Sequence, residues 1–257
     1  VPATGPDGFR MGKGHTRDFN SNAPVSVSKG HMHGSDTPHR VVLTKPFCID
    51  ALEVTVGEWM VCMAAKQCPK PEQAHPFVTY SRKLLDHPVN CVDWRAAKHY
   101  CEWQGKTLPT EAQWEWAATG GDGRRFPWGD EPPSCKRADY TYGVLRRPAS
   151  DDGCHGGGPS AVGTHPDGDR IWPSGRIHDL AGNVWEWCLD NYAPYPKKDV
   201  VDPLYRRGDH NSHVVRGGGW NRSHTGIRTT FRGGARVDYR VPGVGLRCVR
   251  NAVLGAR

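Results

Sequence analysis

The sequence predicts an α+β protein in which short helices and short strands are joined by long stretches of ordered coil. Glycine and proline together supply 52 of the 257 residues (31 Gly and 21 Pro), well above the usual proportion of about 12%. Three segments open with helix-capping residues, and several short apolar runs are typical of strands. Ten tryptophans are spread along the chain, so we expect aromatic clusters to hold this loop-rich chain together.

Three helices are expected, each beginning at a residue that can accept a hydrogen bond from the first turn. Thr55 and Thr110 each stand three residues before a Glu or Gln, which is the capping-box pattern. Asp93 can cap a further helix, for which Gly105 is a suitable stop. The expected helices run from Thr55 to about Lys66, from Trp94 to Gln104 and from Thr110 to about Ala118.

Short strands are expected on both sides of the helices. Residues 1–40 are polar and rich in Gly and His, and are expected to form an extended N-terminal segment. Between Gly120 and Gly175 turn residues dominate. No repeat and no linker divides the chain, so residues 1–257 are expected to form one domain. The expected strands cover residues 41–43, 47–49, 184–189, 214–216, 227–232 and 245–250.

The charge balance is basic, with 34 Lys and Arg against 27 Asp and Glu, a net charge of +7. The basic residues are scattered and become denser from Arg206 onward, which suits either a solvated surface or a face for an acidic partner. The sequence contains no nucleic-acid-binding motif, so no nucleic acid partner is expected. No stretch approaches the length of about 18 apolar residues that a membrane span needs.

One segment carries more information than any other. Residues 175–187, GRIHDLAGNVWEW, place an Asp, an Asn and a Glu among Gly and Trp residues. Five further motifs accompany it: GFRMG (8–12), PTEAQWE (109–115), FPWG (126–129), VRGGGW (215–220) and GLRC (245–248). In this order, over nearly the whole chain, the motifs resemble those of the formylglycine-generating-enzyme family, whose domain is also called the sulfatase-modifying-factor domain. The resemblance implies a C-type-lectin-like α+β fold with a small antiparallel sheet core, two main helices and much ordered coil.

The resemblance also implies a calcium ion in this segment. Carried over, its ligands are the side chain of Asp179, the carbonyl oxygens of Gly182 and Val184, and Glu186. Oxygen ligands on a Gly-containing loop suit calcium, and a buried Glu between two Trp residues needs a partner. Asp179 replaces the more usual Asn of the family, which adds negative charge. The structural alternative is that Asp179 and Asn183 only make the hydrogen bonds of a turn.

A second family calcium site corresponds to Asp139, the carbonyl oxygen of Tyr140 and Asp152. These carboxylates are equally compatible with solvated loop positions.

The family's oxidase converts a cysteine to formylglycine with a copper(I) ion held by two cysteines. In the family these follow the Gly-rich block, and here the corresponding segment is WNRSHTGIR, residues 220–228. It contains no cysteine, although soft thiolates are the ligands that hold copper(I). We therefore expect no formylglycine-generating activity.

Nine cysteines suggest an oxidising, extracytoplasmic location, which could be periplasmic, secreted or within the secretory pathway. None forms a CxxC motif, which argues against zinc ribbons and thioredoxin-like chemistry. The resemblance implies a Cys101–Cys248 disulfide, whereas the positions of a second family bridge, near Ala118 and Gly233, have both lost their cysteines. Cys62 and Cys68, and likewise Cys135 and Cys154, can pair locally, which leaves Cys48, Cys91 and Cys188.

Residues 220–239 are a candidate binding face for a protein or peptide ligand. Trp, Tyr and Arg are enriched in binding hot spots, and related domains, including variable proteins of diversity-generating retroelements, bind ligands here. The alternative is that Trp220, Phe231 and Arg236 are core or scaffold residues. The candidate contacts are Trp220, Asn221, Arg222, His224, Arg228, Arg232, Arg236 and Tyr239.

Histidines offer a different metal chemistry. Some relatives belong to non-haem iron enzymes, which use three His, or two His and a carboxylate. In the ergothioneine-type enzymes most of these ligands come from a separate helical domain, which this chain lacks. The candidates here are His31, His33, His39, His210 and His213.

The sequence therefore favours a calcium-stabilised, extracytoplasmic binding domain. The alternative is a metal-dependent oxidase or oxygenase that uses iron or copper on the same scaffold.

Overall fold

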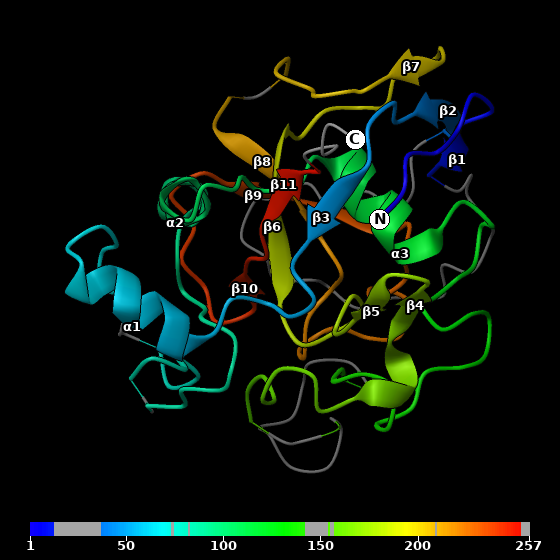
Figure 1. Ribbon diagram of the computed structural model, residues 1–257. Helices are drawn as coiled ribbons and strands as arrows, with labels where there is room; N and C mark the ends of the chain where they lie inside the picture. Colours follow the sequence, from blue (N-terminus) through cyan, green and yellow to red (C-terminus); the bar gives the residue numbers. More distant parts are fainter. Residues whose placement is uncertain are drawn as a thin grey trace.

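The computed structural model describes residues 1–12, 37–72, 75–81, 83–141, 154, 157–208 and 210–252 (Figure 1). Of the predicted site residues, His31, His33 and Asp152 lie outside these ranges. The described residues form three α-helices of similar length, a single 3-10 turn and small β-sheets. The helices are α1 (Val56–Ala64), α2 (Trp94–Trp103) and α3 (Glu111–Thr119).

Each helix begins where its capping residue predicts. The Thr110 hydroxyl accepts a hydrogen bond from the Gln113 amide (3.1 Å), while the Gln113 side chain accepts one from the Thr110 amide (3.0 Å). Thr55 and Glu58 form the same capping box at α1, and Asp93 caps α2. These bonds satisfy amides that the first helical turn leaves unpaired, which explains why local sequence was enough to place the helices.

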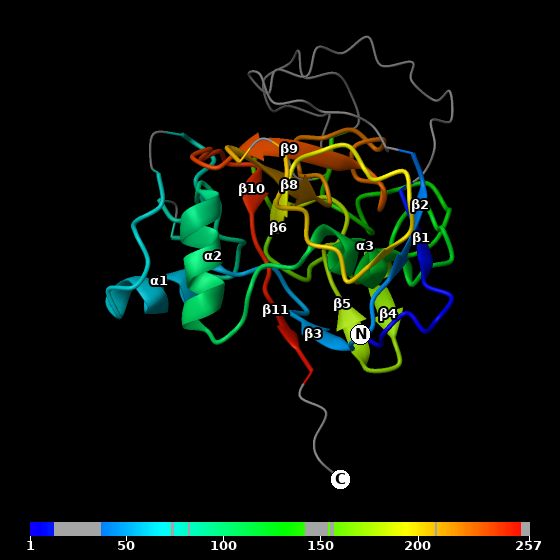
Figure 2. The ribbon, with the colours of Figure 1, turned by 90° about the horizontal axis from the view of Figure 1, so that it is seen from above.

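A four-stranded sheet lies at the centre of the molecule, in the order β10 (Val244–Gly245), β6 (Trp185–Asn191), β8 (Ser212–Arg216) and β9 (Arg232–Arg236). β6 and β8, and β8 and β9, pair antiparallel, whereas β10 runs parallel to β6. In two views at right angles, α2 lies on one side of β6 and α3 on the other (Figures 1 and 2).

Successive side chains of β6 point to opposite faces of the strand, and each face packs into a different hydrophobic core. Trp185 and Trp187 pack with the residues of α1 and α2, whereas Cys188 packs with those of α3. Because successive side chains of a strand point to opposite faces, Glu186 shares the α3 side with Cys188. Both faces of the strand are therefore buried, and the α3 side must accommodate charged groups.

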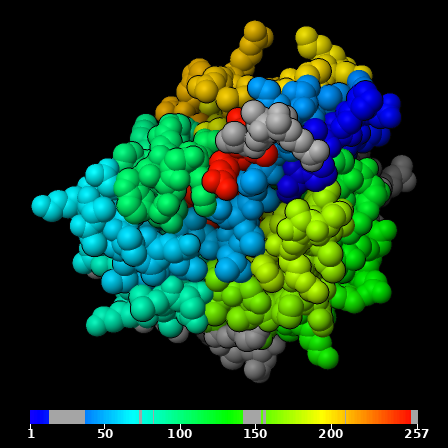
Figure 3. All heavy atoms as spheres, in the orientation of Figure 1, coloured from blue at the N-terminus to red at the C-terminus, as the bar shows by residue number. Residues whose placement is uncertain are grey.

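Smaller sheets join distant parts of the chain. β1 (Phe9–Met11), β2 (His39–Val42) and β7 (Val200–Val201) form one sheet, and β3 (Phe47–Ile49) pairs with β11 (Val249–Asn251). β4 (Arg170–Trp172) and β5 (Gly175–Ile177) form a hairpin. In the space-filling view, segments from the early, middle and late parts of the chain share one face (Figure 3).

The strand predicted at residues 227–232 is misplaced. Residues 227–230 form turns, and β9 begins only at Arg232. The carbonyl oxygens of Thr229 and Phe231 accept hydrogen bonds from the Arg216 side chain, so they are not available to a β-ladder. Pairing with β8 instead draws two consecutive glycines, Gly233 and Gly234, into the strand, against their low β-propensity.

The predicted strand at 245–250 is divided between two sheets. β10 and β11 are separated by three buried residues, of which Arg247 pairs with Glu186 and Cys248 with Cys101. The three pairs expected from the sequence are bonded in the structure: Cys62–Cys68, Cys101–Cys248 and Cys135–Cys154. Within the described ranges, no helix is both long and apolar enough to cross a membrane.

Candidate functional site

The loop from Asp179 to Glu186 is built on two left-handed residues. Asp179 (φ 55°) and Asn183 (φ 57°) belong to the residue types that most readily adopt this conformation besides glycine. The Gly163 amide donates to Asp179 Oδ2 (2.6 Å), and the Ser160 amide donates to Asn183 Oδ1 (3.0 Å). Both side chains therefore make the turn and loop hydrogen bonds that the structural alternative predicted.

Glu186 has a dedicated partner in Arg247. The Arg247 guanidinium donates two hydrogen bonds to the Glu186 carboxylate (2.7 and 2.8 Å), and Trp114 Nε1 donates a third (2.7 Å). Both side chains of the pair are fully buried. This bidentate pairing neutralises the charge of Glu186 and occupies both of its oxygens.

Glu53 is a further buried carboxylate at this loop, which no sequence motif indicated. It accepts hydrogen bonds from the Asn183 side chain (2.5 Å) and from the Val184 amide (3.2 Å). Burial, and then repulsion from Asp179 and Glu186, raise the pKa of Glu53 well above its usual value. Three buried carboxylates thus surround one guanidinium, an excess of negative charge that a hard cation would relieve.

At the second predicted calcium site, Asp139 and Tyr140 make hydrogen bonds within the protein, and Asp152 lies outside the described residues. Asp139 Oδ2 accepts hydrogen bonds from the amide and hydroxyl groups of Ser160 (3.0 and 2.8 Å), and the Tyr140 carbonyl accepts one from the Cys154 amide (3.2 Å). The Asp139 carbonyl accepts the Asn183 amide (2.9 Å) and lies so close to Gly182 that a Cβ there would meet it at 2.1 Å. Asp139 therefore braces the first loop.

In the described part of the chain, no group of three His, Cys, Asp or Glu side chains has a metal-binding arrangement. His213 stacks on Trp94 with ring centroids 3.7 Å apart, and His210 contacts Asn191. His39 is buried in β2 against Tyr195. His210 and His213 line one pocket, but among the described residues no third His, Asp or Glu joins them in a metal-binding arrangement.

A pocket of about 310 Å³ opens beside the central sheet and uses part of the predicted binding face. Trp220, Asn221, Arg222 and Tyr239 line it, and His75 and Phe77 from a distant loop complete its wall. The Phe77 ring meets the Trp220 ring edge-on, with centroids 5.0 Å apart. Neither His75 nor Phe77 belongs to a motif, so sequence analysis missed them.

The other four residues of the predicted face lie outside this pocket. His224 is exposed, and Arg228 donates to the Thr225 carbonyl (3.0 Å). Arg236 is exposed and pairs with Asp238. The prediction that Arg232 contacts a ligand is wrong. Its side chain is only 1% exposed, and its guanidinium binds the Glu111 carboxylate.

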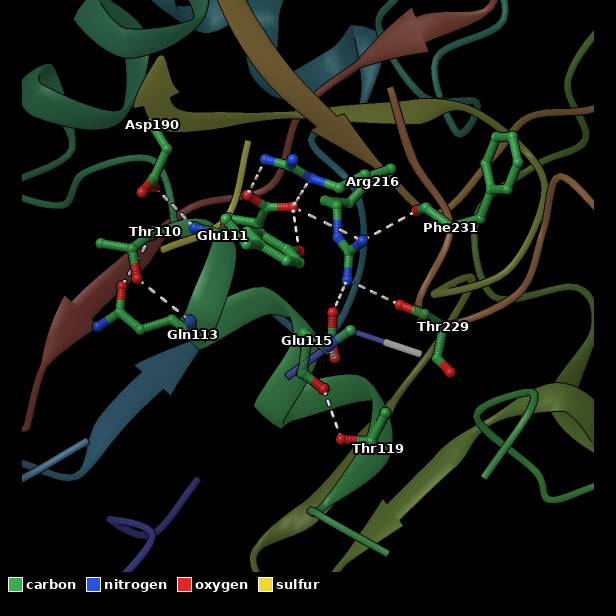
Figure 4. A network of polar contacts seen from close by, with 12 residues as sticks. Thr110, Glu111, Gln113, Glu115, Thr119, Asp190, Arg216, Thr229 and Phe231 are labelled. Carbon is green, nitrogen blue, oxygen red and sulfur yellow. Dashed lines mark hydrogen bonds and ion pairs between the residues drawn. The ribbon is translucent and has the colours of Figure 1, made fainter. Parts of the chain in front are cut away.

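A buried ionic network fixes the chain beneath the pocket (Figure 4). Arg216 pairs with Glu115, and donates to the carbonyls of Thr229 (2.8 Å) and Phe231 (3.0 Å). Burial alone would raise the pKa of Glu111, but the Arg232 and Arg216 guanidinium groups outweigh it and leave that pKa lowered. The segment leading from Trp220 back into β9 is thus anchored by buried charges.

No cysteine lines the pocket. Cys188 is buried in the core on the α3 side of β6, on the face opposite Trp185, which does line the pocket. Cys91 is also buried, and burial raises the pKa of its thiol to about 12. Cys48 is exposed on β3. None of the three free cysteines can therefore provide a thiolate pair in the pocket.

The fold and the sequence motifs together identify the family of this domain. Residues 9–252 match the sulfatase-modifying factor enzyme 1-like domain, and the chain belongs to this family. It is 32% identical over 238 residues to a formylglycine-generating enzyme of Streptomyces coelicolor, covering 89% of this chain and 72% of that protein.

Other relatives carry different names. An inactive C-alpha-formylglycine-generating enzyme 2 of Bos taurus is 32% identical over 177 residues, which cover 66% of this chain and about half (52%) of that protein. A hercynine oxygenase of Mycobacterium tuberculosis is 32% identical over 158 residues, 57% of this chain and 33% of that protein. Among solved structures, PvdO from Pseudomonas aeruginosa superimposes with a TM-score of 0.72 at 25% identity, covering 98% and 93% of the two chains.

Proposed function

We propose that this chain is a ligand-recognition domain of the formylglycine-generating-enzyme family that does not oxidise cysteine to formylglycine. The observation that carries the proposal is the chemistry of the pocket. Where the family's oxidase needs two thiolates, the segment after the Gly-rich block contributes Asn221 and Arg222 to the wall, beside Trp220. A guanidinium and an amide bind and orient polar ligands, but they do not hold copper(I).

The activity test uses a peptide substrate. Purified protein is incubated with copper(I), oxygen and a peptide containing Cys-x-Pro-x-Arg, and the peptide is analysed by mass spectrometry. We expect its mass to stay that of the cysteine form, while the Streptomyces coelicolor enzyme converts it in parallel. Formation of the aldehyde by this chain would contradict the proposal.

We also propose that a calcium ion stabilises the loop between Asp179 and Glu186. The donor set supports this, because Glu53 and Asp179 are buried oxygen ligands with excess negative charge, and the carbonyls of Gly182 and Val184 lie in the same loop. Glu186 remains the carboxylate ligand that the family resemblance implies, and Glu53, which lies at the same loop, is a further candidate ligand. Three disulfides accord with an extracytoplasmic site of action, where calcium is plentiful.

Removal of the ion should lower thermal stability. A chelator is expected to lower the melting temperature of the wild type, since a ligand bound only to the folded state stabilises it by mass action, by about 2.7 kcal/mol at 100 times its Kd. Asp179→Ala should lose most of this response, whereas Asp238→Ala, on the exposed surface, should retain it. An unchanged wild-type melting curve, measured by differential scanning fluorimetry, would exclude the calcium site.

The alternative is an iron- or copper-dependent oxidase or oxygenase, and the similarity to hercynine oxygenase is the observation that favours it. Elemental analysis of the purified protein separates the two proposals. Calcium without stoichiometric iron or copper supports recognition, and stoichiometric iron or copper supports catalysis.

A further inference from the structure

Arg222 is a cation in the pocket for which the described residues provide no anion. Its Nε is buried and has no hydrogen-bond acceptor. The guanidinium carbon lies 5.8 Å from the centroid of the Trp185 ring, over its face. Burial lowers the pKa of Arg222, so the surroundings do not compensate its charge fully.

The fully buried arginines of the described residues behave differently. The guanidinium groups of Arg216, Arg232 and Arg247 each pair with a glutamate. Arg222 is only partly buried, lines the pocket and has no carboxylate partner among the described residues. Its guanidinium is therefore available to an anion that enters the pocket.

Apart from Arg222, Asn221 and His75, the pocket is lined mostly by aromatic and aliphatic side chains and by glycines. Four aromatic side chains form its walls: Phe77, Trp185, Trp220 and Tyr239. Gly233 and Gly234, in the middle of β9, also line it. Asn221 adds one polar group, whose Oδ1 is buried and has no hydrogen-bond partner among the described residues. The volume of about 310 Å³ is at the small end of ligand pockets and suits a group the size of one aromatic amino acid.

We propose that the pocket binds a carboxylate attached to a flat, apolar group, with the carboxylate held by Arg222 and the apolar group held between the aromatic walls. The planar guanidinium matches a carboxylate through two parallel hydrogen bonds. One guanidinium balances one negative charge, which favours a carboxylate over a phosphate dianion. This inference rests on the proposed function, because both take this pocket as the binding site.

The test compares an acid with its neutral amide on the intact chain. N-acetyl-phenylalanine and N-acetyl-phenylalanine amide are titrated separately, with the quenching of tryptophan fluorescence and calorimetry as readouts. The acid should bind about 10- to 100-fold more tightly than the amide, since a hydrogen bond to a charged group contributes about 1.5–3 kcal/mol. This comparison uses only the wild type and does not depend on the folding of a variant.

Two matched variants locate the effect. Arg222→Gln should abolish the difference between acid and amide. Arg236→Gln removes the same charge from the neighbouring exposed surface and should leave the difference intact. Near-ultraviolet circular dichroism verifies that both variants remain folded.

Such a carboxylate could belong to the C-terminus of a peptide or to a free acid, and a titration with a peptide distinguishes the two. A pentapeptide ending in Phe with a free carboxyl group should bind at least as tightly as N-acetyl-phenylalanine if the natural ligand is a chain end. If it is a free acid, the pentapeptide should bind more weakly. Both outcomes support the carboxylate anchor.

Three results would overturn the inference: acid and amide binding within about twofold of each other, an acid preference that survives in Arg222→Gln, or no carboxylate binding up to about 10 mM. Each would leave the proposed function standing as long as no formylglycine forms. Aldehyde formation would instead overturn the proposed function, whatever the carboxylate result.

Discussion

Asp190 is a buried carboxylate with two backbone partners and no arginine of its own. The amides of Glu111 and Tyr205 donate to it (2.8 and 2.9 Å), and its side chain lies within the network drawn in Figure 4. Burial, and then repulsion from Glu111, raise the pKa of Asp190 to about 7. In the unfolded chain the same group titrates near pH 3.9.

This difference predicts a pH dependence of stability. Between about pH 4 and pH 7 the folded protein holds a proton that the unfolded chain has lost, so stability decreases as pH rises, by up to about 1.4 kcal/mol per pH unit. Asp190→Asn imitates the protonated form and should flatten this slope in urea unfolding measured across the window. Asp238→Asn, whose carboxylate is exposed, should leave the slope unchanged. Glu53, whose pKa is also raised, should leave a residual slope, so the result that would contradict the assignment is a slope in Asp190→Asn equal to that of the wild type.

At the scale of elements, two disulfides act over very different lengths of chain. Cys101 at the end of α2 is bonded to Cys248 between β10 and β11, 147 residues away, whereas Cys62 and Cys68 are separated by six. Closing a long loop removes more freedom from the unfolded chain than closing a short one.

The two bridges should therefore differ in their effect. In the chain-entropy relation the long loop contributes about 5 kcal/mol and the short one about 2 kcal/mol. We expect Cys101→Ser/Cys248→Ser to lower the free energy of unfolding by the larger amount in guanidinium titrations without reductant. The double variant Cys62→Ser/Cys68→Ser is the matched control, and equal losses would contradict the loop-length explanation.

How far the sequence predicts these elements depends on how local their causes are. The helices were placed well, because Thr55, Asp93 and Thr110 act on amides within the same turn. β9 was misplaced, because its position is decided by Arg216 and by pairing with β8.

The candidate site follows the same rule. Trp220, Asn221 and Arg222 belong to a motif segment and could be predicted as pocket residues. Glu53 and Phe77 could not, since no local pattern indicates that they reach the loop or the pocket. Arg232 was assigned to the wrong environment, because its partner Glu111 lies 121 residues away.

At the scale of the whole molecule, the small sheets join segments that are far apart in the sequence. β3 pairs with β11, and β2 pairs with β7, so early and late segments share hydrogen bonds. Both hydrophobic cores also draw residues from early and late parts of the described chain. Each of the three described helices buries residues in one of these cores, so none of them could unfold without exposing apolar surface.

We therefore predict a single cooperative unfolding transition for the oxidised protein. Scanning calorimetry should give equal calorimetric and van't Hoff enthalpies, and near- and far-ultraviolet circular dichroism should change together. Two resolved transitions would show that the interlaced strands do not couple the parts into one domain.

The pairing of β3 with β11 also constrains how the protein matures during synthesis. Ile49 pairs with Val249, which is synthesised 200 residues later (249 − 49). At ordinary translation rates this is a delay of about 10–40 s. During this interval the edge of β3 and the thiol of Cys101 have no native partner. Until β11 has been synthesised, the nascent chain is therefore exposed to wrong disulfides and to aggregation.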